Sequence, residues 1–102
     1  MGRLEMLQEH LAEFPNDAFA RYGLAMEYAN AGDSDTALRE FATLLENNPD
    51  YTAGYFMAAQ TLAKVARTEE AREMLRKGII SAERTNNAHA RSEMEGMLAE
   101  IS

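Results

Sequence analysis

The sequence has no cysteine, and none of its apolar runs is long. Without cysteine the chain cannot form a disulfide, use a thiolate nucleophile or bind zinc through sulfur, which fits a reducing compartment. A membrane span needs roughly 18 consecutive apolar residues, and no such run is present. The first residues, MGRLEMLQEHLAEF, also lack the apolar stretch of a signal peptide. We therefore expect a cytoplasmic protein with no membrane contact.

Positive charge is also scarce, because 10 Lys and Arg residues stand against 17 Asp and Glu residues, for a net charge of -7. Residues 1–51 hold three basic and ten acidic residues, whereas residues 52–102 hold seven of each. Binding to nucleic acid requires a basic surface, so we expect no nucleic-acid partner. The acidic excess is interpreted either as solvated helix faces or as a surface that repels anionic partners.

A chain of 102 residues with 46% hydrophobic residues is enough for one domain with a modest core. The two prolines, Pro15 and Pro49, stand 34 residues apart, and this spacing prompts a search for repeats. A shift of 34 residues aligns three identical alanines and several residues of the same class. The pairs include Ala25 with Ala59, Ala29 with Ala63, Ala37 with Ala71, Tyr22 with Phe56, Tyr28 with Leu62, Phe41 with Leu75 and Leu45 with Ile79. The chain therefore contains a weak internal repeat.

Each unit has the apolar spacing of two helices joined by a short turn. In the first unit, Gly32 is suited to the left-handed conformation that ends a helix, and Ser34 is expected to cap the next helix. A connection this short predicts an antiparallel hairpin. We expect the repeated alanines, such as Ala37 and Ala71, to lie where two helix axes approach closely.

The residues that recur resemble the consensus of the tetratricopeptide repeat family, in its small bacterial type. The matching positions of the first unit are Leu24, Ala25, Tyr28, Gly32, Ala37, Phe41 and Pro49. The second unit departs from the consensus with Ala58, Ala66 and Glu83 in place of Leu, Gly and Pro. The resemblance covers nearly the whole chain. It implies an all-α fold in which antiparallel helical hairpins stack into a right-handed superhelix.

We expect about six helices, near residues 3–14, 17–31, 34–47, 51–65, 68–84 and 87–101. They form a single domain with an N-terminal half-repeat helix at 3–14, repeat 1 at 18–51, repeat 2 at 52–85 and a C-terminal capping helix at 87–101. Asn87 is expected to cap the last helix, which carries Ala90, Met94, Met97, Leu98 and Ile101 on one side. Terminal helices of this kind cover the open ends of a repeat stack.

No group of residues predicts catalysis. His10 shares a column with Leu44 and Gly78 and is expected to be a structural, partly buried histidine, and His89 is expected to form a solvated ion pair with Glu93. Ser34 and Thr68 are interpreted as helix caps, because no base stands beside them. The sequence predicts no enzyme activity, no metal site and no cofactor.

In the family that the chain resembles, the first helices of the repeats line a concave face that binds a partner segment. The resemblance assigns to this face Phe19, Tyr22, Met26 and Asn30 from the first unit, and Ala53, Phe56, Met57, Gln60 and Lys64 from the second. Family members that clamp an acidic C-terminal carboxylate have Lys and Asn on it, and here Tyr22, Met26, Phe56 and Gln60 occupy the matching places. Aromatic and methionine side chains suit an apolar protein or peptide segment instead.

Two alternatives stay open at this stage. The last helix could fold over these residues and turn the face into core. The face, or the opposite convex side, could also meet a second copy of the chain, which would make the protein a homo-oligomeric scaffold.

Overall fold

The computed structural model describes residues 2–101, which form six α-helices and no strand. The helices are α1 (Arg3–Glu13), α2 (Ala18–Asn30), α3 (Ser34–Asn47), α4 (Thr52–Lys64), α5 (Thr68–Arg84) and α6 (Ala88–Glu100). Each bound lies within one residue of the range expected from the sequence. None of these helices is both long enough and apolar enough to cross a membrane.

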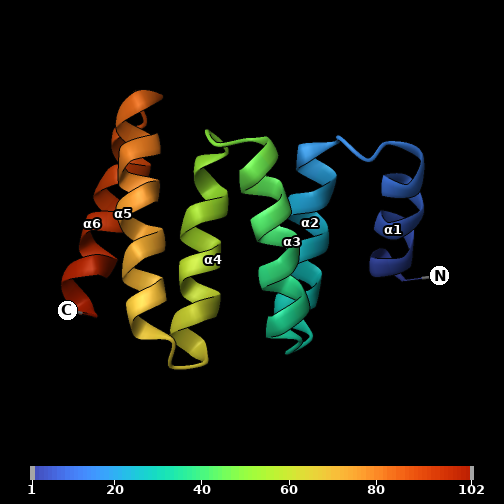
Figure 1. The fold of residues 1–102 in the computed structure, drawn as a ribbon, viewed down its shortest axis with the longest axis horizontal. Helices are drawn as coiled ribbons and strands as arrows, with labels where there is room; N and C mark the ends of the chain where they lie inside the picture. The colour runs from blue at the N-terminus through green and yellow to red at the C-terminus, as the bar shows by residue number, and fades with distance from the viewer. Residues whose placement is uncertain (1, 102) are drawn as a thin grey trace.

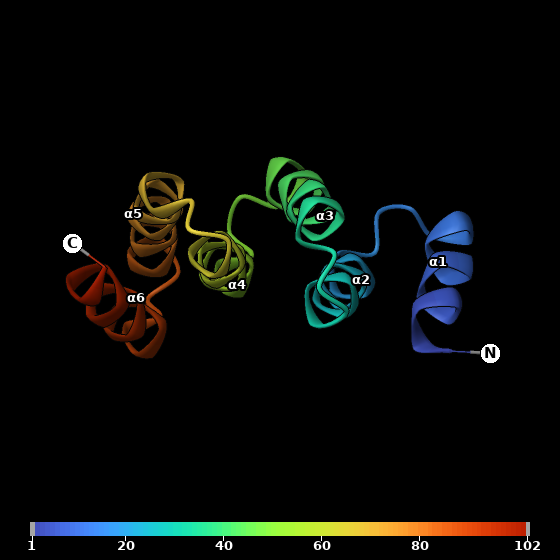
Figure 2. The same cartoon turned by 90° about the horizontal axis from the view of Figure 1, so that it is seen from below.

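The helices stand side by side in chain order, as Figure 1 shows. Helices α2 and α3 form one hairpin, and α4 and α5 form another, and the packing within these two pairs is the most extensive. Contacts between α3 and α4 link the two hairpins. Seen along the helices in Figure 2, α3 and α5 lie on one edge, and α2, α4 and α6 lie on the other. The domain is therefore an elongated slab of 40 × 29 × 19 Å with two distinct long faces.

Three of the turns end a helix through a residue in the left-handed conformation. These residues are Gly32 (φ 85°), Ala66 (φ 62°) and Asn86 (φ 56°). At the first turn, the N–H of Gly32 donates to Ala29 and that of Asp33 donates to Tyr28, the two bonds of a Schellman motif. The turns at Ala66 and Asn86 have the same pair of bonds. The left-handed position expected at Gly32 is confirmed.

The expected caps at Ser34 and Thr68 are wrong. Helix α3 begins at Ser34, directly after the Schellman motif, so Ser34 is the first helical residue. The cap is Asp33, whose carboxylate accepts the N–H of Thr36. In the second turn Arg67 stands at the cap position and makes no such bond; its guanidinium binds Glu70 instead. The cap expected at Asn87 is confirmed, because its side chain accepts the N–H of Ala90.

Alanines let the two helices of each hairpin approach closely. Ala25 and Ala37 are fully buried between α2 and α3, and Ala59 and Ala71 are fully buried between α4 and α5. The core around them is divided into three clusters along the slab, and the cluster at the N-terminal end consists of Leu11, Ala20 and Leu24. The burial of these four alanines agrees with the contact predicted from their repetition in the sequence.

Helix α6 continues the series of α2 and α4, but it starts two residues later than the 34-residue period predicts. It starts at Ala88, which is 36 residues after Thr52 at the start of α4, whereas α4 starts 34 residues after Ala18. This shift gives Met94 the place that Leu24 has in α2 and Ala58 has in α4, and all three are buried. Helix α5 has 17 residues against 14 in α3, and the connection after it, at 85–87, is one residue shorter than that at 48–51, which together give the shift of two.

Candidate partner-binding face

A cluster of aromatic rings joins α2, α3 and the turn that precedes α4. The Tyr22 ring lies edge-on to Phe41, with ring centroids 6.4 Å apart, and packs against Tyr51 at 5.2 Å. Tyr22 and Tyr51 are half-buried, whereas Phe41 is buried beneath them. The rings are therefore held in place from below while part of their surface faces solvent.

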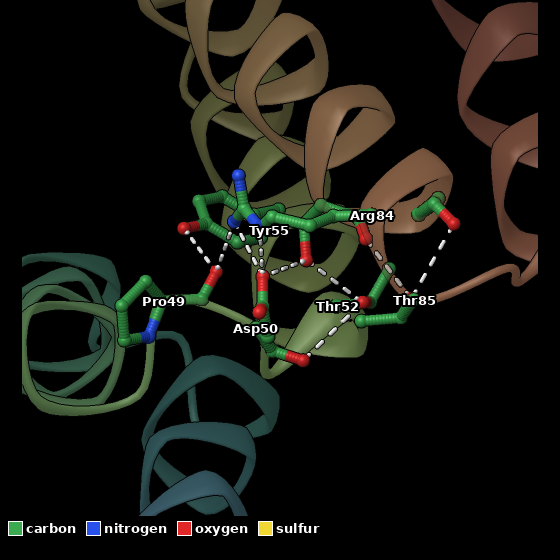
Figure 3. A network of polar contacts seen from close by, with 8 residues as sticks. Pro49, Asp50, Thr52, Tyr55, Arg84 and Thr85 are labelled. Atoms are coloured by element: carbon green, nitrogen blue, oxygen red, sulfur yellow. Dashed lines mark hydrogen bonds and ion pairs between the residues drawn. The ribbon is translucent and has the colours of Figure 1, made fainter.

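A polar network, drawn in Figure 3, holds the Pro49-Asp50 turn that precedes Tyr51 in the chain. The Tyr55 hydroxyl donates to the Pro49 carbonyl at 2.8 Å, and the Arg84 guanidinium binds the Asp50 carboxylate, with Nε 2.7 Å from Oδ1. Beside them the buried hydroxyls of Thr52 and Ser81 are 2.9 Å apart. These contacts attach the start of α4 to the end of α5.

The charges in this network are partly exposed. The Arg84 guanidinium lowers the pKa of the Asp50 carboxyl, and Asp50 in turn raises the pKa of Arg84. Both groups are therefore charged at neutral pH. About half of each side chain faces solvent, so the ion pair positions the turn more than it stabilises the fold.

We call the side of the slab formed by α2, α4 and the turn before α4 the α2–α4 face. Its hydroxyls, on Tyr22 and Tyr51, remain protonated at neutral pH. Burial raises the pKa of Tyr22, and burial together with the nearby Tyr22 and Asp17 raises the pKa of Tyr51. A neutral phenol both donates and accepts a hydrogen bond. The rings thus combine an apolar surface with a polar edge, as is common for aromatic residues at interfaces.

The structure brings some of the residues assigned to the face together and separates others. Tyr22, Met26 and Met57 pack on one buried cluster, which contains Phe41 and Leu44. Phe56 packs on a different cluster, together with residues of α6. Among the remaining assigned residues, Phe19 is 73% exposed, Gln60 is half-buried, and Asn30, Ala53 and Lys64 are exposed.

The sequence analysis missed Tyr51. This residue packs on both clusters and so joins the two halves of the face. Tyr51 follows the Pro49-Asp50 pair and directly precedes α4, so the sequence pattern indicated an ordinary turn residue. The signal that could have identified it is its aromatic side chain, which is unusual in a turn made of polar residues.

Helix α6 packs against α5 and α4 and makes no close backbone contact with α2. The cluster beneath Tyr22 and Met26 receives no residue from α6. Met94 instead enters a notch at Gly78, beside Tyr55. Helix α6 therefore extends the row formed by α2 and α4.

The two histidines have local roles. His10 does not lie in a buried packing column, as its alignment with Leu44 predicted, because its side chain is exposed. It has a structural role instead: the ring packs on Phe14, and Nε2 lies 2.7 Å from the Asp17 carboxylate. His89 pairs with Glu93 at 3.3 Å on the surface, as expected. Within residues 2–101 no three His, Asp or Glu side chains are grouped to hold a metal ion.

Comparison with known proteins relates the chain to one family. A family model described as "Tetratricopeptide repeat" matches residues 1–55. A TPR repeat-containing protein of Pseudomonas aeruginosa is 26% identical over 98 residues, which cover 96% of this chain and 93% of that protein.

Solved structures give the same result for the fold. A tetratricopeptide repeat domain protein from Salinibacter ruber superposes with a TM-score of 0.82 at 28% identity, covering 86% of this chain and 89% of that one. YrrB, described as a TPR protein with an unusual peptide-binding site, gives a TM-score of 0.79 at 30% identity, covering 91% of this chain and 46% of that one. The all-α fold of stacked helical hairpins expected from the sequence is confirmed.

Proposed function

Because the chain belongs to the tetratricopeptide repeat family, we propose that it is a non-enzymatic interaction module that binds a segment of a partner protein on the α2–α4 face. We divide it into repeats at 18–51 and 52–85, with residues 3–14 and 87–101 as terminal helices. The family and fold support a protein-interaction module. The cytoplasmic location expected from the lack of cysteine stays a prediction.

The aromatic arrangement of the face carries this proposal. Tyr22 is anchored by Phe41 and Tyr51 but keeps part of its ring in solvent, and Phe19 on the same helix is 73% exposed. Rings that are fixed before binding lose little conformational entropy on contact with a partner. Anchored and partly exposed aromatics are the residue type that most often dominates binding energy.

The composition of the face indicates the chemistry of the segment. Met26 and Met57 adapt their shape, so an apolar side chain would pack against them. Gln60 and Lys64 add donors near the C-terminal end of α4, where a carbonyl or a carboxylate of the segment would be bound. We therefore expect a segment with bulky apolar residues next to a polar or acidic one.

Peptides selected from a random display library against the wild-type protein would test the face. We expect Phe19→Ala and Tyr22→Ala each to weaken the selected peptides by about 1–3 kcal/mol, since each removes an aromatic contact. The matched control is Ile80→Ala, which removes an apolar side chain that is 55% exposed on α5. Peptides that bind all three variants as tightly as the wild type would contradict the proposal.

Thermal melts of Tyr22→Ala and Phe56→Ala show whether the face is surface or core. Losses below about 1 kcal/mol indicate an open face. Losses of about 3–5 kcal/mol in both variants would mean buried aromatics, and the face could not bind a partner.

The alternative is a homo-oligomeric scaffold, favoured by the exposure of Phe19 and Ile80 on two different helices. Molar mass in solution, measured over a range of concentrations, separates the two functions. A dimer fraction that increases with concentration and is lost in Phe19→Ala supports self-association. A monomer at all concentrations supports binding to a different protein.

A further inference from the structure

A second surface lies at the corner between α1 and α2, outside the α2–α4 face. An open hollow of about 600 Å³ is lined there by His10, Glu13, Phe14, Pro15, Asn16 and Asp17. We call it the corner hollow. None of these residues belongs to the set assigned to the α2–α4 face.

The local sequence explains why an aromatic side chain is exposed at the corner. Pro15 disfavours a helical conformation at Phe14, whose φ of -125° and ψ of 72° end α1 and turn its side chain outward. As a result Phe14 is 53% exposed. The ring is nevertheless positioned, because His10 stacks on it with centroids 5.0 Å apart.

Asp17 holds the other side of the hollow in place. One carboxylate oxygen accepts the N–H of Ala20 and so caps α2, and the other is 2.7 Å from His10 Nε2. The His10 ring is therefore held between Phe14 and Asp17. The apolar wall of the hollow exists before any partner arrives.

The rim of the hollow carries a carboxylate that nothing in residues 2–101 neutralises. Glu13 has no hydrogen bond or ion pair there, and neither has Glu9, one turn earlier on α1. The arginines of this half of the chain bind other groups: Arg3 pairs with Glu27, and Arg39 binds Thr36. Arg21 lies beside the hollow, where it donates to the Pro15 carbonyl at 3.1 Å, but its charge is paired with Glu40. The hollow lies in the half of the chain, residues 1–51, that holds ten acidic and three basic residues.

We propose that the corner hollow binds an arginine side chain of a partner protein. The aliphatic stem of arginine would lie on Phe14 and Pro15, and its planar guanidinium would stack on the Phe14 ring and pair with Glu13. Arginine fits better than lysine because the guanidinium combines stacking with two parallel hydrogen bonds to one carboxylate. The negative field of residues 1–51 would attract such a segment and would disfavour the same acidic half of a second copy.

The test uses the ¹⁵N-labelled protein and a blocked tripeptide with arginine between two glycines. We expect amide shift changes centred on residues 13–17, with a dissociation constant in the range of about 1–10 mM. The same tripeptide with citrulline, which has the shape of arginine without its charge, should bind at least about 5-fold more weakly. Raising the salt concentration should weaken the arginine tripeptide further.

Matched variants locate the site. Glu13→Gln and Phe14→Ala should each weaken the tripeptide about 3- to 10-fold, because one removes the charge and the other removes the ring. Glu46→Gln, which neutralises an exposed carboxylate on α3, and Ile80→Ala, which removes an exposed apolar side chain on α5, should leave binding unchanged. Thermal melts check that each variant folds, and only folded variants are compared.

Three results of the tripeptide titrations would overturn the proposal. They are no shift change up to about 20 mM tripeptide, equal binding of the citrulline tripeptide, and shift changes that persist in both Glu13→Gln and Phe14→Ala. A concentration-dependent dimer that is lost in Phe14→Ala would also overturn it, because the occupant would then be a second copy.

Discussion

Ala66 takes the place in the second unit that Gly32 has in the first, and both are in the left-handed conformation. A side chain with a Cβ is strained there by about 1–2 kcal/mol, whereas glycine is not. The turn keeps both Schellman bonds despite this strain. The packing of α4 on α5 therefore imposes a conformation that the local sequence disfavours.

We predict that Ala66→Gly stabilises the protein by about 0.5–1 kcal/mol, because relief of the strain exceeds the added freedom of the unfolded chain. Urea unfolding at constant m value measures the difference. The matched control is Ala42→Gly at an exposed position inside α3, where the same substitution should destabilise by about 0.5–1 kcal/mol. Equal signs for the two variants would show that Ala66 is not strained.

Glycine inside a helix has a packing role at one position of α5. Gly78 faces the start of α4 and the middle of α6, and a Cβ built on it would lie 2.7 Å from Tyr55 Cβ and closer still to Met94 Sδ. The notch at Gly78 thus lets Met94 reach the core, where it is completely buried. A Cβ built on Gly96 of α6 would have no neighbouring atom within 4 Å.

We expect Gly78→Ala to destabilise the protein by about 1–3 kcal/mol, since α6 must move away or Met94 must change rotamer. Gly96→Ala should instead stabilise by about 0.5–1 kcal/mol, because alanine favours a helix and meets no neighbour. Hydrogen exchange of α6 amides should be faster in Gly78→Ala than in the wild type. Unchanged exchange together with unchanged stability would contradict the role of the notch.

Alanines at the hairpin contacts allow a second test of helix packing. Ala37→Leu and Ala71→Leu each add three carbon atoms where the exposed fraction of the side chain is 0%. Each should destabilise by about 1–3 kcal/mol in a urea titration, whereas Glu46→Gln should change stability by less than about 0.5 kcal/mol. If the leucine variants prove as mild as Glu46→Gln, the helices of a hairpin are not in close contact at these alanines.

The helices could be predicted from the sequence because apolar spacing, alanine pairs and turn residues all indicated the same elements. The capping residues at the α2–α3 turn could not, because the Schellman motif moved the cap from Ser34 to Asp33. The exposure of His10 was missed because the equivalent positions of the later units, Leu44 and Gly78, are buried, and the spacing alone does not distinguish the terminal helix from them. At the α2–α4 face, Tyr51 was missed because its contact with Tyr22 depends on how the hairpins stack.

Two aspartates connect the stability of the whole molecule to pH. The hydrogen bond to His10 lowers the pKa of Asp17, and the hydrogen bond to Arg84 lowers the pKa of Asp50. When the folded pKa lies below the unfolded value of about 3.9, ionisation stabilises the fold at every pH above that value. This stabilisation is lost as the pH falls through the folded pKa.

We therefore predict a melting temperature that declines below about pH 4. Asp50→Asn should melt below the wild type at pH 7, and the two curves should converge near about pH 2, where both side chains are uncharged. Circular dichroism melts from neutral to acid pH measure the gap between them. A gap that stays constant over this range would mean that the charge of Asp50 does not stabilise the fold.

The row of helices also determines how the domain would respond to a pulling force. Extensive contacts join only neighbouring helices, α1 touches α2 and no other described helix, and Leu11 is the buried residue of α1. A force applied at the two ends of the chain would load these outer contacts first, because each helix is held mainly by its neighbours. Helix α1 should detach before the hairpin of α4 and α5, so a stretching trace should show successive steps.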